Sequence, residues 1–323
     1  MQLHDIYIHS YKHIRNCYKL AEGDTSFFAV KPIKIIWFRF FYSILTLIAW
    51  IANKTLPLYL HYTKSKNLSI QENIVVSLTS FPARINYVWL TIETIKRQTI
   101  RPFKIILYLS KEQFPNQDND LPQNLLNECD ELFEIKFVDD DLRSHKKYYY
   151  AFQEYANKNV VTFDDDVFYE SHILEYLYHS HKKNVGCIIS SRACVINPKA
   201  KYHTWVRPKE KNIQMANLLP IGIGGVLYPP LSYSQKIFDK KAIKEKCYKA
   251  DDLWLNYMCR LQGSKIVMID WCYGNITIDI KNNVTLYDSN IDENDQQIKN
   301  ISEWGKLLGL PDFFHINILS NKG

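Results

Sequence analysis

The sequence predicts an α/β fold in which helices flank a mixed, mostly parallel sheet, and three observations favour this class. Beyond a polar stretch at residues 61–72, short apolar runs alternate with segments of helical periodicity, which is the pattern of βαβ units. The run at 160–163, Val-Val-Thr-Phe, is apolar and β-branched and follows a turn-like Asn-Lys-Asn, as expected of a short buried strand. The chain has 323 residues and is 46% hydrophobic, which is enough for one large α/β domain with additions.

Each predicted element follows from its own period and its flanking residues. Strands are predicted at residues 74–78, 104–109, 134–138, 160–163, 186–190 and 266–269. Helices are predicted at residues 88–98, 144–157, 171–183, 250–261 and 298–308, the fourth of them capped by Gly263. Residues 196–222 show no period and are expected to be irregular. The glycine-rich turn at 221–226 is neither a dinucleotide fingerprint nor a P-loop, so we interpret its glycines as points of close backbone approach.

The positive charge of the chain is concentrated near its beginning. Residues 1–70 hold nine Lys or Arg and three Asp or Glu, which accounts for the whole net charge of +6. Because the remaining residues are neutral overall, a general nucleic-acid-binding surface is not expected. Seven scattered cysteines without a C-x-x-C pair favour reduced thiols in a cytoplasm. We expect a helical extension at 1–70, a main domain at 71–275 and a C-terminal extension at 276–323 that packs on it.

Residues 35–52 form the most apolar run of the chain. Eighteen residues is the lower edge for a membrane span, and Arg39 interrupts the run. Lysines flank the run, and Trp37 and Trp50 lie near its ends, a combination that suits an anionic membrane surface. Three interpretations stay open: a helix lying in the membrane interface, a membrane span, and a helix buried against the protein. We expect a membrane surface to be contacted through residues 31–54.

Three consecutive carboxylates, Asp164, Asp165 and Asp166, follow the predicted strand at 160–163. At the carboxyl end of a strand in an α/β sheet, such side chains face the crevice where ligands bind. Adjacent carboxylates repel one another, and a divalent cation would remove that cost. Oxygen ligands suit Mg²⁺ or Mn²⁺, which are usually shared with the phosphates of a substrate. A solvated acidic turn is the alternative interpretation.

Three stretches of the chain carry a resemblance to a known family. They are Val-Ser-Leu-Thr-Ser-Phe-Pro-Ala-Arg at 76–84, Thr-Phe-Asp-Asp-Asp at 162–166, and the segment Ala-Asp-Asp-Leu-Trp to Gly at 250–263. In order and spacing they resemble the donor-nucleotide loop, the D-x-D motif and the late acidic motif of nucleotide-sugar glycosyltransferases with the GT-A (Rossmann-like) fold. Within that group the chain is similar to the family-2-like enzymes of bacterial surface-polysaccharide assembly. The missing Gln-x-x-Arg-Trp argues against a polymerising synthase, and Asp251 stands where the family has Glu.

The resemblance implies roles for the residues that contact the donor. Asp166 would be the metal ligand, and Asp164 would assist the metal or face the ribose. Asp165 is a further candidate for the ribose, although neighbouring strand residues face opposite sides and it can point away instead. Thr79 and Ser80 would contact the donor from the nucleotide loop.

Basic residues are candidates for the diphosphate or the base. Arg84 can clamp a phosphate bidentately, whereas Lys146 and Lys147 would act as point charges. A solvated helix face is the alternative for each lysine. We interpret residues 139–141, a second Asp triplet, as a polar turn rather than a nucleobase contact, and His315 is a remote candidate for a third metal ligand.

Asp252 is the predicted catalytic base. An inverting transfer needs one carboxylate to deprotonate the acceptor hydroxyl as that oxygen attacks the anomeric carbon. Asp251 and Asp252 also stand at the start of a predicted helix, where carboxylates favour the helix dipole. We therefore expect Asp251 to cap this helix and Asp252 to project into the cleft.

The expected function is transfer of a hexosyl group, with inversion, from a nucleotide diphosphate sugar to a hydroxyl of a lipid-linked or surface glycan. The enzyme would be cytoplasmic and held peripherally at the inner face of the cell membrane. Two alternatives stay open. A sugar-phosphate nucleotidyltransferase would carry a glycine-rich loop after the first strand, and residues 79–84 contain no glycine. A catalytically inactive, membrane-associated carbohydrate-binding or scaffold protein would be indifferent to the replacement of Asp166.

Overall fold

The computed structural model describes residues 2–23, 31–63, 65, 70–208, 212–269, 275–280 and 286–314. The strands are β1 (Ile70–Thr79), β2 (Arg101–Ser110), β3 (Phe133–Val138), β4 (Asn159–Thr162), β5 (Val167–Phe168), β6 (Ile188–Ser190), β7 (Ala193–Val195), β8 (Ile213–Gln214), β9 (Leu218–Pro220), β10 (Val226–Tyr228), β11 (Ile266–Met268) and β12 (Ile276–Thr277). The helices are α1 (Leu3–Gly23), α2 (Lys31–Tyr62), α3 (Val88–Lys96), α4 (Gln123–Leu126), α5 (Lys146–Glu154), α6 (Ile173–Lys183), α7 (Lys240–Lys246), α8 (Asp251–Leu261) and α9 (Leu286–Leu307).

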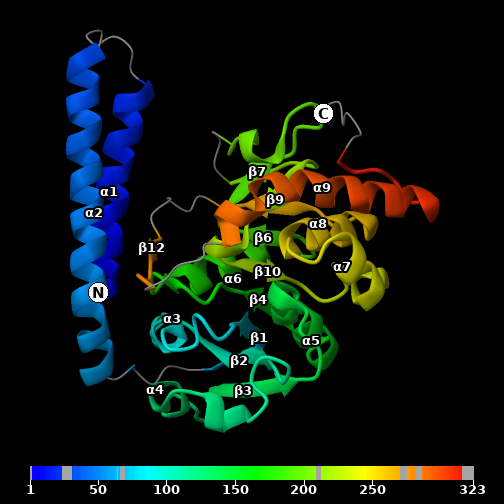
Figure 1. Ribbon diagram of the computed structural model, residues 1–323, viewed down its shortest axis with the longest axis horizontal. Coiled ribbons are helices and arrows are strands. Elements are labelled where there is room, and N and C mark those ends of the chain that lie inside the picture. Colours follow the sequence, from blue (N-terminus) through cyan, green and yellow to red (C-terminus); the bar gives the residue numbers. More distant parts are fainter. Residues whose placement is uncertain are drawn as a thin grey trace.

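An eight-stranded sheet forms the centre of the molecule, in the order β3-β2-β1-β4-β10-β6-β11-β8 (Figure 1). The neighbours β3, β2, β1 and β4 pair in parallel, as do β6 and β11. Strand β10 is antiparallel to both β4 and β6, and β8 is antiparallel to β11. The predicted α/β class with a mixed, mostly parallel sheet is confirmed. One consequence matters for the site: β1, β4 and β6 end at the same edge of the sheet, where β10 begins.

Both faces of the sheet are covered by helices, which explains why its strands read as nearly continuous apolar runs. In β1, Ile74, Val76 and Leu78 face one buried cluster, whereas Val75 faces the other, as the two-residue period of a strand requires. The first cluster includes apolar residues of α3, α4 and α6. The second includes those of α5, α7, α8 and α9. The sheet is thus the middle layer of three.

Helices α1 and α2 form an antiparallel hairpin that stands along one side of this core (Figure 1). The hydroxyl of Tyr59 donates to Gln2, and the ring of Tyr18 lies 5.0 Å from that of Phe38, so α1 follows α2 over most of its length. Only the last part of α2 packs on the core, where Ala52, Leu56 and Leu60 are buried in one cluster with residues of α3, β5 and β12. Only 11% of the most apolar 18-residue stretch of α2 is buried. The interpretation of residues 35–52 as a helix buried against the protein is therefore wrong.

Hydrogen bonds and ion pairs fasten α1 to the segment that follows β5. The carboxylate of Asp5 accepts hydrogen bonds from the backbone N–H of Ser171 at 2.9 Å and from its hydroxyl at 2.8 Å. Glu170 accepts from His9 at 2.7 Å and pairs with Lys12. The hairpin is thus attached to the chain only a few residues after the Asp triplet.

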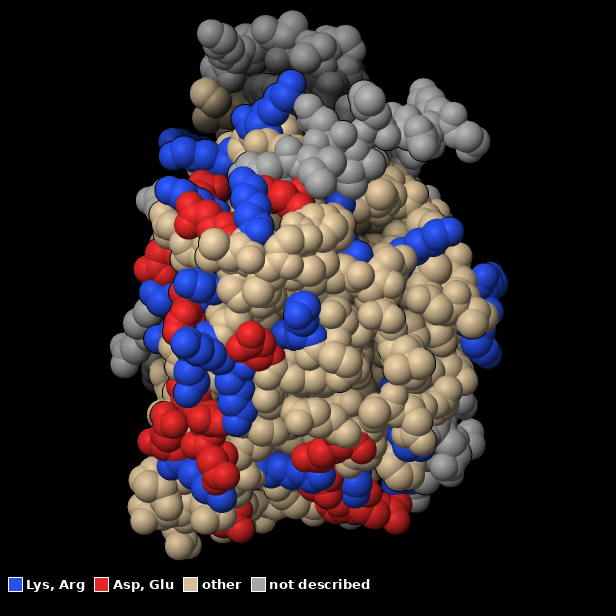
Figure 2. Space-filling view, turned by 90° about the vertical axis from the view of Figure 1, so that its right-hand side faces the viewer, with Lys and Arg blue, Asp and Glu red and all other residues tan. Residues whose placement is uncertain are grey.

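The charged residues on the opposite side of the molecule show no excess of one sign. Figure 2 presents the face that lies away from the hairpin, and Lys and Arg alternate there with Asp and Glu along one side and the lower edge. This mixture agrees with the sequence, in which the positive excess belongs to residues 1–70.

The C-terminal helix is longer than predicted, because α9 begins at Leu286 and not at residue 298. Its side chains turned toward the core include the polar Asn294 and Gln297 before Ile298 and Ile301. Polar residues at inward positions hide the helical period, so the pattern became visible only from Ile298 onward.

Two other stretches also differ from the sequence prediction. The segment predicted to be irregular holds β8 and β9, and β9 pairs with β7, but strands of two or three residues are too short to show alternation. Helix α7 was not predicted, since Ala242 and Ile243 are its only apolar residues. Asp239 caps it by accepting from the backbone N–H of Ala242 at 2.9 Å.

Candidate functional site

Four polar segments meet at the edge where β1, β4 and β6 end. The loop after β1 carries Ser80 and Arg84, the Asp triplet follows β4, and Arg192 follows β6. The glycine turn 222–225 leads into β10 at the same edge, beside the start of α8. In open α/β sheets, ligands bind in a crevice outside the carboxyl ends of the strands. The topology therefore brings most of the sequence-predicted site residues to one place.

Asp165 is the inward-pointing member of the Asp triplet. Its carboxylate accepts from the Ser80 hydroxyl at 2.5 Å and from Arg84 Nη1 at 2.8 Å, and its residue is 5% exposed. The same Arg84 nitrogen lies 3.0 Å from Asp166 Oδ2. Arg84 thus ties the loop after β1 to two of the three carboxylates. The alternative interpretation, in which Asp165 points away from the site crevice, describes its placement better than a ribose contact does.

Asp164 is joined to α8 through a buried lysine. Lys147 Nζ lies 2.9 Å from Asp164 Oδ1 and 2.9 Å from Asp251 Oδ2. Burial disfavours the charge on Lys147, but the surrounding Asp164, Asp251 and Asp252 outweigh it and raise the pKa of the ammonium well above its usual range. Burial also disfavours a charged Asp251, and Lys147 reverses the effect and lowers the pKa of that carboxyl. Both groups of the pair are therefore charged at neutral pH.

Gly222 lies between Lys147 and two carboxylates. A Cβ on Gly222 would be 3.1 Å from Lys147 Nζ, 3.2 Å from Asp252 Oδ1 and 3.3 Å from Asp164 Oδ1. The backbone N–H of Gly222 donates to Asp252 Oδ2 at 3.1 Å. These contacts bring Asp164, Lys147 and Asp252 around one glycine, and they agree with the interpretation of this turn as a point of close backbone approach.

Two carboxyl groups of the site hold their protons unusually tightly. Burial, followed by repulsion from Asp251, raises the pKa of Asp252 to about 8, and Lys147 only partly offsets this. Burial, followed by repulsion from Asp165, raises the pKa of Asp166 to about 7 in spite of Arg84. Such shifts are typical of sites where a carboxylate takes part in proton transfer or receives a cation.

Several predicted residues have positions that the sequence did not indicate. The hydroxyl of Thr79 donates to the backbone oxygen of Tyr108 at 2.8 Å, and that of Ser80 donates to Asp165, so both hydroxyl protons are used within the protein. The solvated alternative for Lys146 and Lys147 is wrong, because these residues are 1% and 4% exposed. Lys146 pairs with Asp141. Asp141 belongs to the second Asp triplet, at 139–141, which forms a polar turn after β3.

The expected cap of α8 is also different. Ala250 occupies the N-cap position and no side chain caps the helix, whereas Asp251 is the first helical residue. The physical reason is the buried ammonium of Lys147, which binds the Asp251 carboxylate more strongly than a backbone N–H would. Asp252, one residue on, is partly exposed. His315 lies outside the described residues.

Arg192 is a site residue that sequence reasoning missed. Its Nε is buried and, among the described residues, has no hydrogen-bond partner, and the same holds for Nε of Arg84. A Cβ on Gly224 would lie 3.0 Å from Arg192 Cβ, which puts Arg192 beside the glycine turn. The sequence held a signal for it, since Arg192, like Arg84, is an arginine in the loop that follows a predicted strand. Two unpaired guanidinium donors at this edge suit an anionic ligand.

The carboxylates fit a cation that arrives with a ligand better than one held by protein alone. Within the described part of the chain, no three His, Cys, Asp or Glu side chains are grouped as metal ligands. The side chains of Asp164 and Asp166 are 29% and 18% exposed, so a ligand at this edge of the sheet can reach both. Mg²⁺ is commonly bound through one or two carboxylates, with substrate phosphates and waters completing its shell. This donor set matches that pattern, and a cation would replace the proton that Asp166 retains.

No family model and no curated protein sequence matches the chain. Among solved structures, the chain is similar to a glucose-1-phosphate thymidylyltransferase from Bacillus anthracis in complex with sucrose, with 14% identity and a TM-score of 0.35 over 64% of this chain and 88% of that one. It is also similar to an apo UDP-glucose pyrophosphorylase, with 8% identity and a TM-score of 0.37 over 69% of this chain and 97% of that one. Both names denote nucleotidyltransferases. At identities and TM-scores this low, the likeness carries no conclusion about the activity of this chain.

Proposed function

We propose that the chain is an enzyme that binds a nucleotide diphosphate sugar at the edge formed by β1, β4 and β10 and transfers the sugar to a hydroxyl of a glycan. The observation that carries this proposal is the convergence of Asp164, Lys147 and Asp252 around Gly222, beside the Asp165–Arg84–Asp166 group. Acidic, basic and proton-holding groups within one crevice are what a displacement at a sugar carbon requires.

The two ends of the crevice would divide the reaction between them. The oxygen of the acceptor hydroxyl attacks the anomeric carbon, its proton passes to Asp252, and the bond from that carbon to the diphosphate oxygen breaks with its electron pair on the leaving group. Asp252 is suited to the first task because a base works best when its pKa lies near the working pH. The guanidinium groups of Arg84 and Arg192 are suited to the second, since both lie at this edge of the sheet and can donate to phosphate oxygens.

Asp166, with Asp164, would hold the metal of the site. Mn²⁺ or Mg²⁺ bound there together with the diphosphate would neutralise the charge that develops on the leaving group. Asp165 is proposed as a positioning residue, because Ser80 and Arg84 already occupy its carboxylate. Thr79 and Ser80 would shape the donor loop in the same indirect way.

Nucleotidyl transfer is the second candidate, and it is the reaction class named by both similar structures. It would use the same acidic edge and cation, but it joins a nucleoside triphosphate to a sugar phosphate and releases pyrophosphate. The loop after β1 counts against it, since residues 79–84 lack the glycines that cradle a triphosphate.

The released product separates these candidates. The full chain is incubated with Mn²⁺ and a panel of nucleotide diphosphate sugars, with a mixture of simple glycosides as acceptors, and released nucleoside diphosphate is measured. A parallel reaction contains nucleoside triphosphates and sugar 1-phosphates, and released pyrophosphate is measured. We expect nucleoside diphosphate in the first reaction and release that is about 10²–10⁴ times slower in Asp252→Asn. Pyrophosphate from the wild-type chain would replace the first candidate by the second. Neither product, together with no nucleotide binding, would leave the carbohydrate-binding or scaffold interpretation.

A further inference from the structure

One side of α2 carries a continuous row of exposed apolar residues. Steps of three or four residues repeat along the helix, which sets their side chains on one face. This row, called the apolar stripe below, consists of Ile36, Phe40, Ser43, Leu47, Trp50 and Leu58, with Lys54 between the last two. Its five apolar members are between 53% and 66% exposed. Large apolar side chains that are this exposed in a contiguous set indicate a surface that something covers.

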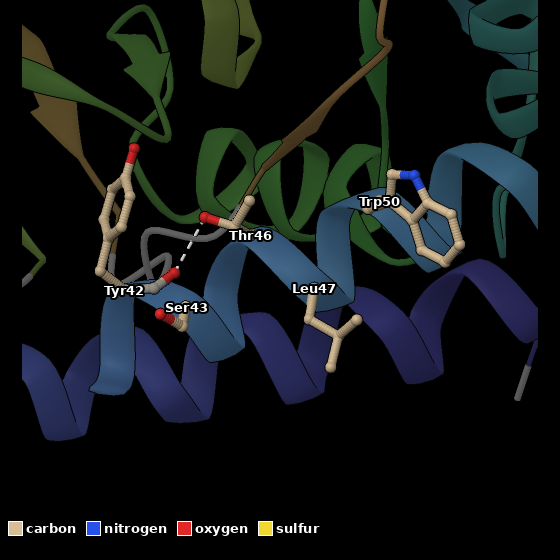
Figure 3. A pocket seen from close by; sticks show the side chains of 5 residues that line it. All are labelled: Tyr42, Ser43, Thr46, Leu47 and Trp50. Carbon is tan, nitrogen blue, oxygen red and sulfur yellow. Dashed lines mark hydrogen bonds between the residues drawn. The ribbon is translucent and has the colours of Figure 1, made fainter. Parts of the chain in front are cut away.

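The middle of the apolar stripe is hollowed. Figure 3 shows Tyr42, Ser43, Thr46, Leu47 and Trp50 lining a shallow depression, with the two aromatic rings at its ends. The hydroxyls of Ser43 and Thr46 donate to backbone oxygens one turn earlier in α2, at 2.8 and 2.9 Å. Because these hydroxyl protons are used within the helix, the floor of the depression has few hydrogen-bond donors left for a partner.

The charges around the stripe all have one sign. No Asp or Glu occurs between residues 25 and 71, whereas this stretch contains six Lys or Arg. Two of these, Arg39 and Lys54, are exposed on α2. An apolar face with a rim of cations is complementary to the headgroups and acyl chains of an anionic bilayer.

The position of α1 shows how α2 would meet that bilayer. The Tyr7 hydroxyl lies 3.0 Å from Thr55, and the Tyr18 ring lies 5.0 Å from Phe38, so the α1 residues between them run beside the apolar part of α2. That part of α1 includes Lys12 and Arg15, and Lys12 pairs with Glu170 of the core. A bilayer-spanning α2 would draw these charges into hydrocarbon, where each of them is costly. This cost favours a helix lying flat over a helix that spans the bilayer.

We propose that the apolar stripe of α2 docks in the plane of an anionic lipid bilayer, while Ala52, Leu56 and Leu60 of α2 stay packed on the catalytic core. Trp50 and Phe40 enter the acyl region, while Arg39 and Lys54 contact the headgroups. The hairpin then holds the enzyme at a fixed distance from its bilayer, since Asp5 and Glu170 fasten α1 to the segment after the Asp triplet. This proposal concerns a surface remote from the crevice and stands or falls independently of the reaction.

Flotation of the full-length chain with vesicles tests the proposal. Wild type is compared on vesicles of equal parts phosphatidylglycerol and phosphatidylcholine, and on phosphatidylcholine alone. The triple variant Phe40→Gln, Leu47→Gln, Trp50→Gln removes apolar area from the stripe. Its matched control, Tyr176→Gln, Val185→Gln, Leu307→Gln, removes three exposed apolar side chains elsewhere. Circular dichroism establishes that each variant retains its helices.

The expected result is strong flotation of wild type and control on the anionic vesicles. The triple variant should bind at least about tenfold more weakly, because it loses the burial of three large apolar side chains. Arg39→Gln and Lys54→Gln should each weaken binding to anionic vesicles about fivefold and leave binding to neutral vesicles unchanged. Trp fluorescence should be quenched by bromines near the headgroups and not by bromines at the bilayer centre, whereas quenching at the centre would overturn the flat orientation.

Two outcomes would overturn the proposal as a whole. One is equal flotation of the wild type and the triple variant. The other is absence of flotation together with a dimer, detected by light scattering, that dissociates in the triple variant, because a second copy of the chain would then be the partner of the stripe.

Discussion

At the scale of single residues, the site depends on Lys147 more than on any other side chain. The ammonium of Lys147 pairs with Asp164 at the end of β4 and with Asp251 at the start of α8. It also partly offsets the rise in the pKa of Asp252. Buried ion pairs contribute little compared with apolar residues of similar size, but removing one partner leaves an uncompensated charge. Lys147 therefore joins the two halves of the crevice, and its loss should be felt as both instability and misplacement of Asp252.

Lys147→Met is predicted to destabilise the protein by about 3–5 kcal/mol, because it leaves the buried carboxylate of Asp251 and the partly buried carboxylate of Asp164 without their counter-charge. Chemical denaturation measures this directly. The double variant Lys147→Met, Asp251→Asn should recover part of the loss, since one stranded charge is gone. Lys241→Met serves as the control: its side chain is 84% exposed and should change stability by less than about 0.5 kcal/mol. Equal effects of Lys147→Met and Lys241→Met would contradict the network.

Because of Asp252, activity is predicted to increase as the pH rises. The pKa of its carboxyl is raised to about 8, so the base form accumulates as the pH rises through neutrality. kcat/KM should therefore increase with pH and level off above about 8, and Asp252→Asn should lower kcat by about 10²–10⁴ with donor binding preserved. Rate profiles of the two proteins over pH test this, and an acid-side optimum would contradict the role of Asp252 as base.

The raised pKa of Asp252 is also predicted to make the stability of the fold decrease as the pH rises. A carboxyl whose folded pKa is raised stabilises the fold below its unfolded pKa, and that contribution is lost as the pH rises through the folded value. The Tm of the wild type should therefore fall between about pH 5 and about pH 9, and Asp252→Asn should fall less. Thermal melts at both pH values check the difference.

At the scale of elements, the glycine turn before β10 packs against the residue that precedes the Asp triplet. Gly225 has φ of +89°, and a Cβ there would lie 2.3 Å from the Phe163 ring, directly before the Asp triplet. Gly186 has φ of +77° but no atom within 4 Å of a Cβ, so the two positions differ mainly in steric contact. The turn thus controls where the Asp triplet sits.

Gly225→Ala is predicted to cost about 1–3 kcal/mol more than Gly186→Ala. The positive φ penalises both substitutions by about 1–2 kcal/mol, whereas overpacking against Phe163 applies to Gly225 alone. Denaturant melts of the two variants give the difference. Equal losses would mean that the Phe163 ring can move aside and that the turn does not fix the triplet.

The sequence predicts the position of elements whose buried faces are apolar. It fails for elements in which polar residues face the core. Strand 160–163 and helix α3 were found because buried strands and helices show their period directly. Helix α9 was cut short because Asn294 and Gln297 take core positions, and β8 and β9 are too short to have a period. In the site, spacing marked Asp164–Asp166 and Asp252, but not the burial of Lys147. That contact joins α5 and the end of β4 to α8, which lies far along the chain, so no local pattern encodes it.

At the scale of the whole molecule, the chain consists of a layered core and a hairpin attached close to its site. Asp5 of α1 accepts three hydrogen bonds, from the N–H and hydroxyl of Ser171 and from the N–H of Gln2. Asn53 of α2 donates to the backbone oxygen of Thr277 in β12, the strand that pairs with β5, and accepts from the backbone N–H of Asp279 just beyond it. Both attachments lead to the segment that follows the Asp triplet.

Asp5→Ala is predicted to loosen the hairpin and to cost about 1–3 kcal/mol, because it leaves the buried N–H of Ser171 without its acceptor. Limited proteolysis should then cut near the hairpin sooner than in wild type. Asp139→Ala, whose carboxylate is 86% exposed, is the control and should leave the digestion unchanged. Identical digestion of wild type and Asp5→Ala would show that the hairpin is held by its apolar contacts alone.

Thermal stability tests whether the Asp triplet after β4 binds a nucleotide together with a divalent cation. The Tm of the full chain is measured against a panel of nucleoside diphosphates and their sugars, with and without Mn²⁺, for wild type, Asp166→Ala and the matched variant Asp139→Ala from the other Asp triplet. Selective binding to the folded state raises the Tm by mass action. We expect the Tm to rise with one nucleotide. This rise should require Mn²⁺, persist in Asp139→Ala and disappear in Asp166→Ala. No rise across the panel, or a rise unaffected by Asp166→Ala, would contradict it.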